Sequence, residues 1–193
     1  MKRKAAYPID PIFINRWSPR AMSGEVITDQ ELMTLFEAAR WAPSSYNNQP
    51  WRFLYAKRDT KFWNLFFDLL VPSNQSWAKN AGALVVIISR DTFSYNNKPS
   101  RTSAFDTGSA WENLALQGSL MNLVIHGMEG FDYDKAKQAL NIPAGYTVQA
   151  MFAIGRPGEL KNLPKDLQER ETLSDRNPID SFVAEGTFNE NIK

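Results

Sequence analysis

The sequence predicts one globular domain in which helices and strands are mixed irregularly, and three observations support this fold class. The 193 residues are enough for one domain with a substantial core but too few for two. Hydrophobic patterns of helical and strand type follow one another without regular strand–helix–strand units. No Gly-x-Gly-x-x-Gly sequence follows a strand and no P-loop sequence is present, which argues against a dinucleotide-binding Rossmann domain. Because no linker or internal repeat divides the chain, we expect a single domain over residues 1–193.

The composition excludes several classes of protein. A hydrophobic fraction of 43%, with 6 Trp and 12 Phe, is typical of a globular rather than a disordered chain. A net charge of +1 provides no field that would attract nucleic acid or an anionic membrane surface. The absence of cysteine removes disulfides, thiolate nucleophiles and cysteine metal sites. The single histidine, His126, argues against a histidine metal cluster or a histidine-based catalytic triad.

The chain carries no recognisable targeting or membrane signal. Its basic N-terminus is not followed by the apolar stretch of a signal peptide. No run of residues approaches the ~18 consecutive apolar residues that a membrane span needs. We therefore expect a soluble, cytoplasmic protein without a membrane or nucleic-acid partner.

The first third of the chain predicts an arm, a helix and a strand. Residues 1–15, with two prolines, look like an extended arm. Thr28 and Glu31 have the spacing of a capping box, which places the start of a helix over about 29–41. Alternating apolar residues then predict a strand at about 51–57.

The middle of the chain predicts a second helix, a buried strand and a loop. Apolar residues at helical spacing over 62–70 predict an amphipathic helix that ends before Pro72. The uninterrupted apolar run at 83–88 is typical of a strand buried on both faces. Residues 90–103 are polar and without periodicity, so we expect a mobile loop there.

A long apolar helix is predicted over about 104–127, as the core of the domain or of a dimer. Gly108 and Gly118 lower its helix propensity, which indicates close packing against a neighbour. After it, Asp132 is expected to cap a short helix that reaches about residue 140. A strand at 146–154 follows, and the charged residues from about 160 to 193 are expected to form an arm that wraps a partner subunit.

Two polar stretches carry the candidate chemistry. The first reads RWSPR at residues 16–20, and the second reads APSSYNNQPW at residues 42–51. In the second stretch, Pro43 and Pro50 stiffen a loop rich in small hydrogen-bonding side chains. Such a loop suits a flat polar ligand, although the same residues also suit a capped connection between a helix and a strand.

Together the two stretches resemble the FMN-dependent nitroreductase family, whose members carry Arg-x-Ser-x-Arg/Lys and then Ala-Pro-Ser-Ser/Ala-x-Asn-x-Gln-Pro-Trp. The second match is ungapped over residues 42–51. The resemblance implies an α+β fold, with a central, mostly antiparallel sheet flanked by helices. It also implies an interlocked homodimer with two composite FMN sites at the interface.

The resemblance assigns the flavin phosphate to basic residues near both ends of the chain. Arg16 and Arg20 are the first candidates, because guanidinium groups match phosphate oxygens with two parallel hydrogen bonds. Ser18 would add a hydroxyl group, and Trp17 backbone and ring contacts. Arg176 matches an Arg-x-Pro sequence whose arginine binds the phosphate in the family. The alternative for Arg16 and Arg20 is that they are solvated surface arginines.

Other residues are assigned to the flavin ring and the acceptor slot by the same resemblance. Those that reach the flavin from the partner subunit are Pro43, Ser44, Ser45 and Asn47. Asn74 would bond the isoalloxazine ring or ribityl chain, and the backbone at Glu129 and Gly130 would face the flavin N5. Tyr46, and Phe105 at the end of the 90–105 loop, are candidates for the slot wall.

Two features depart from the family pattern or stay open. The lysine that many members place near the flavin N1–O2 edge aligns with Trp77 here, with Lys79 two residues further on. His126 adjoins the 129–130 turn, but we expect it to hydrogen-bond carbonyls at a helix end rather than to act in catalysis.

The resemblance implies an oxidoreductase that passes hydride from NADH or NADPH through FMN to a nitroaromatic or quinone-type acceptor by a ping-pong mechanism. No protein side chain need act as acid or base at N5, so no catalytic residue is assigned. One alternative is a flavin-binding redox sensor or carrier without significant turnover. Another is a family member with different flavin chemistry, such as dehalogenation or flavin fragmentation. The sequence does not distinguish NADH from NADPH.

Overall fold

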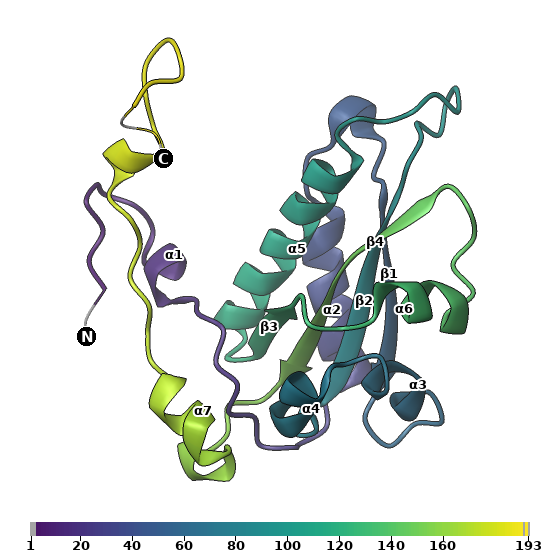
Figure 1. The fold of residues 1–193 in the computed structure, drawn as a ribbon, viewed down its shortest axis with the longest axis vertical. Coiled ribbons are helices and arrows are strands. Elements are labelled where there is room, and N and C mark those ends of the chain that lie inside the picture. Colours follow the sequence, from purple (N-terminus) through teal and green to yellow (C-terminus); the bar gives the residue numbers. More distant parts are fainter. Residues whose placement is uncertain (1–2, 191, 193) are drawn as a thin grey trace.

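A four-stranded antiparallel sheet forms the centre of the structure, with helices on both of its faces (Figure 1). The structure is a computed structural model and describes residues 3–190 and 192. The strand order is β1-β2-β4-β3, and the bounds are Trp51–Lys57 for β1, Ala83–Arg90 for β2, Val124–Met128 for β3 and Tyr146–Gly155 for β4. The antiparallel sheet with flanking helices confirms the predicted α+β fold.

Strand β2 lies in the interior of the sheet and divides the core in two. Its side chains alternate between the faces: Ala83, Val85 and Ile87 join one apolar cluster, whereas Leu84, Val86 and Ile88 join the other. All six side chains are buried. The apolar run at 83–88 is therefore explained by burial on both faces, as predicted.

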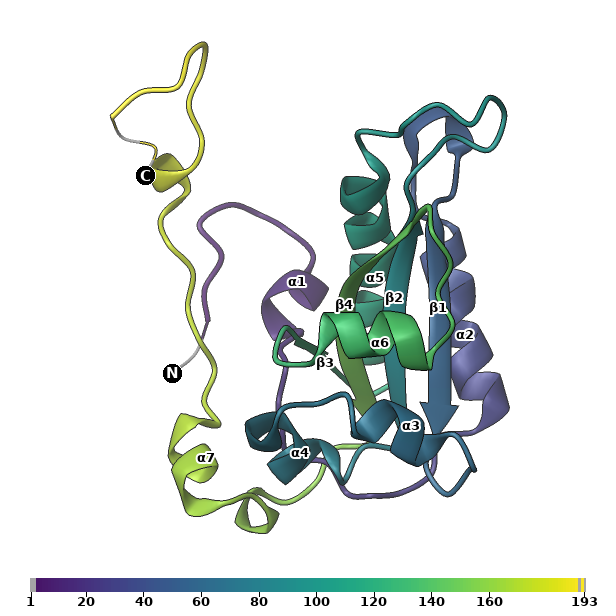
Figure 2. The same cartoon turned by 45° about the vertical axis from the view of Figure 1, so that its right-hand side comes forward.

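Two long helices cover one face of the sheet, α2 (Asp29–Arg40) and α5 (Ser103–Leu120), which lie behind it in Figure 2. The predicted apolar face of α2 packs inward, since Leu32, Leu35 and Ala39 are fully buried. The predicted helix at 29–41 and the predicted strand at 51–57 are both confirmed.

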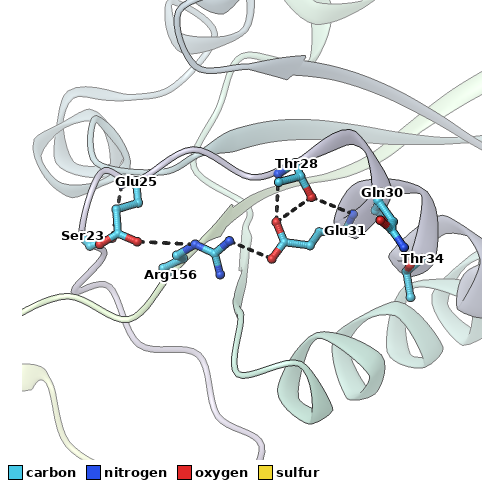
Figure 3. Close-up of polar contacts among 7 residues, drawn as sticks. All are labelled: Ser23, Glu25, Thr28, Gln30, Glu31, Thr34 and Arg156. Atoms are coloured by element: carbon cyan, nitrogen blue, oxygen red, sulfur yellow. Dashed lines mark hydrogen bonds and ion pairs between the residues drawn. The ribbon is translucent and has the colours of Figure 1, made fainter.

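The capping box at the start of α2 is present and is extended by an arginine (Figure 3). The Thr28 hydroxyl oxygen accepts from the Glu31 amide at 3.2 Å, and Glu31 Oε2 accepts from the Thr28 amide at 2.9 Å. Glu31 also pairs with Arg156, which follows β4, at 2.7 Å. The hydrogen bond from the Thr28 amide is the main cause that lowers the pKa of the Glu31 carboxyl. These contacts fix the start of α2 against the end of β4.

Three short helices cover the other face: α3 (Trp63–Phe67), α4 (Pro72–Ala78) and α6 (Tyr133–Ala139). The prediction of one helix over 62–70 that ends before Pro72 is only partly right, because α3 is shorter and Pro72 begins α4. Proline suits the first position of a helix, where no amide hydrogen is needed and its fixed φ is already helical. Asp132 caps α6 as predicted.

The predicted long helix over 104–127 is wrong beyond α5. Asn122 adopts a left-handed φ of 55°, and the amide of Leu123 donates to the carbonyl of Gly118 at 2.8 Å. This is a Schellman termination with asparagine in the usual glycine position. The following residues form the edge strand β3, which pairs with β4.

The two glycines of α5 have different surroundings. A Cβ on Gly118 would lie 2.5 Å from Ile125 of β3, so the predicted close packing is confirmed there. A Cβ on Gly108 would meet nothing within 4 Å in this chain, so Gly108 has no close neighbour within the chain and its packing against a partner stays a prediction.

The remaining connections are less regular. Short 3₁₀ turns occupy Ser45–Asn47, Leu160–Asn162 and Ile179–Ser181. The loop that follows β2 folds back on itself through a bridge between Thr92 and Pro99. Its predicted mobility stays a prediction. Strand β4 confirms the strand predicted at 146–154.

The two ends of the chain run side by side, away from the sheet (Figures 1 and 2). The N-terminal stretch is not wholly extended as predicted, because Pro11–Asn15 forms helix α1, capped by the Asp10 side chain. In the C-terminal stretch, α7 (Lys165–Arg170) buries Leu167 against the core before the chain turns outward. No helix in the described part of the chain is long and apolar enough to cross a membrane.

Candidate flavin site

A basic pocket of about 310 Å³ lies where both ends of the chain meet the edge of the sheet. It is lined by five arginines, Arg3, Arg16, Arg20, Arg170 and Arg176. Trp17 and Ser18 also line it, so the structure brings together every residue that the sequence assigns to the phosphate. A pocket with this charge suits a phosphate or another strong anion.

Residues 16–20 form one wall because they leave α1 in an extended conformation. Arg16 caps the end of α1 with φ −61° and ψ 128°. Its side chain is largely covered, donates to the Ser18 hydroxyl oxygen at 3.3 Å, and lies 3.9 Å from a Glu112 carboxylate oxygen. The alternative of a solvated surface arginine therefore does not describe Arg16.

A buried carboxylate attaches the C-terminal stretch to this wall. Glu171 follows α7, and its side chain is only 4% exposed. One oxygen accepts from the backbone amides of Arg20 and Ala21, the latter at 2.8 Å. The other oxygen lies 3.4 Å from the Arg20 guanidinium group. Glu171 thereby fixes the start of the C-terminal stretch against residues 20 and 21 beside the pocket.

Sequence reasoning missed two of the pocket's arginines, Arg3 and Arg170. The signal for Arg3 was the basic N-terminus, which carries three cations in its first four residues. Burial is the largest cause that lowers the pKa of the Arg3 guanidinium, and repulsion from Arg176 and Arg16 adds to it. The repulsion, the smaller of the two causes, reflects the positive charge that gathers in the pocket.

His126 lies in β3 rather than at a helix end, so its predicted bond to last-turn carbonyls is wrong. Its Nδ1 lies 2.9 Å from the carbonyl oxygen of Pro19. Because a carbonyl only accepts, Nδ1 carries a hydrogen in this arrangement. Burial lowers the pKa of His126, and the bond to Pro19 opposes that effect. His126 thus anchors residues 16–20 to the sheet edge and lines the pocket.

Trp77 and Lys79, the two residues near the expected position of the family lysine, differ in their exposure to solvent. Trp77 is fully buried and packs on the His126 ring, with a centroid separation of 4.5 Å. It therefore presents no edge to a ligand. Lys79 caps the end of α4 and is exposed.

The structure also brings Asn74 to the turn that follows β3. Its Nδ2 donates to the carbonyl of Gly130 at 3.0 Å, and its Oδ1 accepts from the Trp77 indole at 3.3 Å. A Cβ on Gly130 would lie 2.8 Å from Asn74 Nδ2 and 3.0 Å from Val71 Cγ2, so a larger residue would require the Asn74 side chain to move. Glu129 is exposed beside it. Trp77 and His126 connect this turn to the basic pocket.

The loop of the second motif is held at a different place. The Ser45 amide donates to Asp106 Oδ2 at 3.1 Å, and the Ser44 hydroxyl accepts from the Gln49 amide at 3.0 Å. Tyr46 and Asn47 both adopt a left-handed φ, of 52° and 51°. Such backbone is costly for residues other than glycine and is common at functional sites.

Within one chain this loop does not reach the basic pocket. It contacts the first turn of α5, at the end of that helix opposite β3 (Figure 1). Pro43 and Asn47 are exposed there, Ser44 and Ser45 are half-buried, and Asn48 is buried. Tyr46 and Phe105 are 80% and 78% exposed, and the Tyr46 ring packs on Phe93 and Tyr95. The structure therefore divides the predicted residues between two separate surfaces of the chain.

Comparisons with known proteins agree with these features. The model of the nitroreductase family matches residues 14–156. A crystal structure described as an oxidoreductase containing FMN is 46% identical, with a TM-score of 0.93, and the match covers 97% of this chain and 96% of that one. Protein DrgA of Synechocystis is 27% identical over an alignment of 163 residues, and the match covers 69% of this chain and 76% of DrgA. A Rhodopseudomonas palustris protein provisionally named NADH dehydrogenase/NAD(P)H nitroreductase is 26% identical, over 65% of this chain and 72% of its own.

Proposed function

Because the chain belongs to the nitroreductase family, we propose that it is an FMN-dependent oxidoreductase. It takes hydride from NADH or NADPH and passes it to a nitroaromatic or quinone-type acceptor. Donor and acceptor use one slot in turn, in a ping-pong mechanism. The observation that carries the proposal is the pocket of five arginines beside the Asn74–Gly130 turn.

The donor set of the pocket fits the phosphate of FMN. Arg16, Arg20 and Arg176 present guanidinium groups, and Ser18 presents a hydroxyl group. The similarity to an oxidoreductase containing FMN supports the same cofactor here. When bound, FMN would supply the hydride chemistry itself. The protein would then contribute binding, orientation and exclusion of water.

The turn at Asn74 and Gly130 would hold the ring end of the cofactor. A Cβ at Gly130 would fill the contact with Asn74, so the glycine lets main chain approach closely. The backbone at Glu129 and Gly130 would then lie beside N5, as the family resemblance implies. No side chain is assigned a proton-transfer role, and His126 serves to anchor residues 16–20.

We further propose a homodimer with composite sites. One chain supplies the arginine pocket and the turn, and its partner supplies the loop with Pro43, Ser44, Ser45 and Asn47. The separation of these two surfaces within one chain supports this arrangement. Tyr46 and Phe105 are exposed aromatic rings suited to the wall of a slot for flat acceptors. In this proposal the chain is one domain over 1–193, and its arms at 1–15 and about 160–193 pack against the partner subunit.

The visible spectrum of the purified protein tests the proposal. A flavin spectrum that bleaches after anaerobic addition of NADH or NADPH, and recovers with a quinone, supports the reductase and identifies the donor. A bound flavin that neither nucleotide bleaches supports a sensor or carrier instead. A colourless protein that does not bind added FMN contradicts the proposal.

A further inference from the structure

Arg3 joins the two ends of the chain through three backbone carbonyls. Its Nη1 donates to the carbonyls of Ile14 and Arg16 at 3.1 and 2.9 Å. Its Nε donates to the carbonyl of Ser174 at 2.7 Å. A planar guanidinium group can hold several acceptors in a fixed arrangement, which an ammonium group does not do.

The residue that Arg3 holds in the C-terminal stretch is also in contact with Arg176. The Ser174 carbonyl accepts from Arg3, and the Ser174 hydroxyl accepts from Arg176 Nη1 at 3.3 Å. On the other side, the Arg16 carbonyl that Arg3 holds belongs to a residue of the pocket wall. One side chain therefore connects the two segments that bring arginines to the pocket from opposite ends of the sequence.

The C-terminal stretch has a second attachment point at Glu171, which binds the amides of Arg20 and Ala21. Glu171 fixes where the stretch begins, and Arg3 fixes it three residues later. Without the second point, the nearest described hydrogen bond from this stretch to residues 16–21 is that of Glu171, five residues before Arg176. Position 176 thus depends on position 3.

We propose that Arg3 is a positioning residue that closes the phosphate end of the flavin site by tying the segment of Arg176 to the segment of Arg16. The inference rests on the proposed function, because it concerns the phosphate of the same cofactor. Arg3 lies beside other arginines of the pocket, which repel one another. The arrangement in which Arg3 holds both chain ends is therefore most stable when a phosphate dianion lies in the pocket. Closure of the chain ends and phosphate binding are therefore coupled.

A comparison of FMN with riboflavin tests this role, because the two differ only by the phosphate. Binding would be measured on the full chain after removal of its flavin. In Arg3→Ala we expect FMN to bind about tenfold more weakly, while riboflavin affinity changes by less than about twofold. Lys4→Ala is the matched control, because Lys4 is an exposed cation at the next position that does not line the basic pocket. That variant should retain the affinity of the unmodified protein for FMN.

Hydrogen exchange provides the second readout. In Arg3→Ala without flavin, the amides of residues 171–176 should exchange faster, and inorganic phosphate should slow them less than in the unmodified protein. Arg3→Lys, which keeps the charge but not the fixed arrangement of donors, should recover only part of the FMN preference. Full recovery would show that charge alone matters and would overturn the positioning role.

The outcomes separate this inference from the proposed function. If the unmodified protein binds neither FMN nor riboflavin, the proposed function fails. If the unmodified protein prefers FMN and Arg3→Ala keeps that preference in full, only the role of Arg3 is wrong. If Arg3→Ala loses both ligands equally, Arg3 supports the whole fold rather than the phosphate, which also overturns the inference.

Discussion

The backbone amide of Ser45 donates a 3.1 Å hydrogen bond to the buried carboxylate of Asp106, which joins the 43–49 loop to the first turn of α5. The same carboxylate oxygen accepts from the Thr102 hydroxyl at 3.2 Å. Asp106 therefore holds a loop whose backbone includes left-handed residues. The conformation of the loop depends on a residue 61 positions away from Ser45.

Replacing Asp106 should loosen the loop and weaken flavin binding together. Asp106→Ala leaves the Ser45 amide without its partner, which should lower the free energy of unfolding by about 1–3 kcal/mol. Asp106→Asn keeps a carbonyl oxygen that can accept the bond and should have a smaller effect. Urea unfolding and FMN titration measure the two quantities. An Asp106→Ala protein with unchanged FMN affinity would show that the loop does not contribute to the site.

Arg16→Ala should lose flavin without losing its fold. Removing a guanidinium group from a phosphate site should weaken FMN binding by roughly 10- to 100-fold. Arg40→Ala is a suitable control, because Arg40 lies on the surface at the end of α2, where it pairs with Glu37 and lies over the Trp41 ring, away from the basic pocket. Circular dichroism checks the fold and a flavin titration checks binding. Full flavin occupancy in Arg16→Ala would remove Arg16 from the phosphate site.

His126 should make the protein less stable as the pH falls. Burial lowers the pKa of His126 in the folded protein, so below the ordinary value of about 6.5 the unfolded chain binds the proton first. Stability is then complete above that pH and is lost as the pH decreases towards the lower folded pKa. The slope from one proton is at most about 1.4 kcal/mol per pH unit.

His126→Asn is the variant to compare, because its amide can still donate to the carbonyl of Pro19. Denaturant unfolding at several pH values between about 5 and 7 should show a shallower loss of stability in this variant. Glu31, whose pKa is also lowered, loses its contribution at lower pH and is the same in both proteins. Parallel curves for the two proteins would contradict the assignment.

Gly130 and Asn74 should behave as a coupled pair. Gly130→Ala places a methyl group 2.8 Å from Asn74 Nδ2 and should cost about 1–3 kcal/mol of stability through overpacking. In an Asn74→Ala background the clash with that side chain is gone, so the second substitution should cost less. Thermal unfolding of the four proteins gives the interaction energy. Strictly additive costs would mean that the turn does not depend on Asn74.

Local sequence patterns predicted much of the fold. Thr28 and Glu31 marked the start of α2 because a capping box depends only on residues three positions apart. The apolar run at 83–88 marked the buried strand for the same local reason. The sequence does not mark Asn122 as the end of a helix. An asparagine at a helix end can have the same flanking residues in the sequence as an asparagine on the helix surface. The pattern therefore predicts a helix that continues through β3, whereas the structure ends α5 at Leu120.

The site shows the same division between local and distant information. Motif similarity predicts Arg16 and Arg176 at one phosphate site, and the structure brings them together in one pocket. Arg3 matched no motif, since its partners Ile14, Arg16 and Ser174 contribute only backbone carbonyls. Every residue has a backbone carbonyl, so the amino-acid sequence does not indicate which carbonyls accept a hydrogen bond from Arg3. Contacts of that kind require a three-dimensional structure.

The central claim is a flavin site that two chains share, and a heterodimer of two damaged chains tests it most directly. One chain would carry Arg16→Ala and the other Ser44→Ala with Asn47→Ala, each with its own affinity tag so that only mixed dimers are purified. If the sites are composite, one of the two is intact, and the heterodimer should hold about half the FMN of the unmodified dimer at unmodified affinity. Both parent homodimers should bind FMN weakly. A heterodimer that binds FMN as weakly as its parents would show that pocket and loop serve the same chain, and would contradict the account.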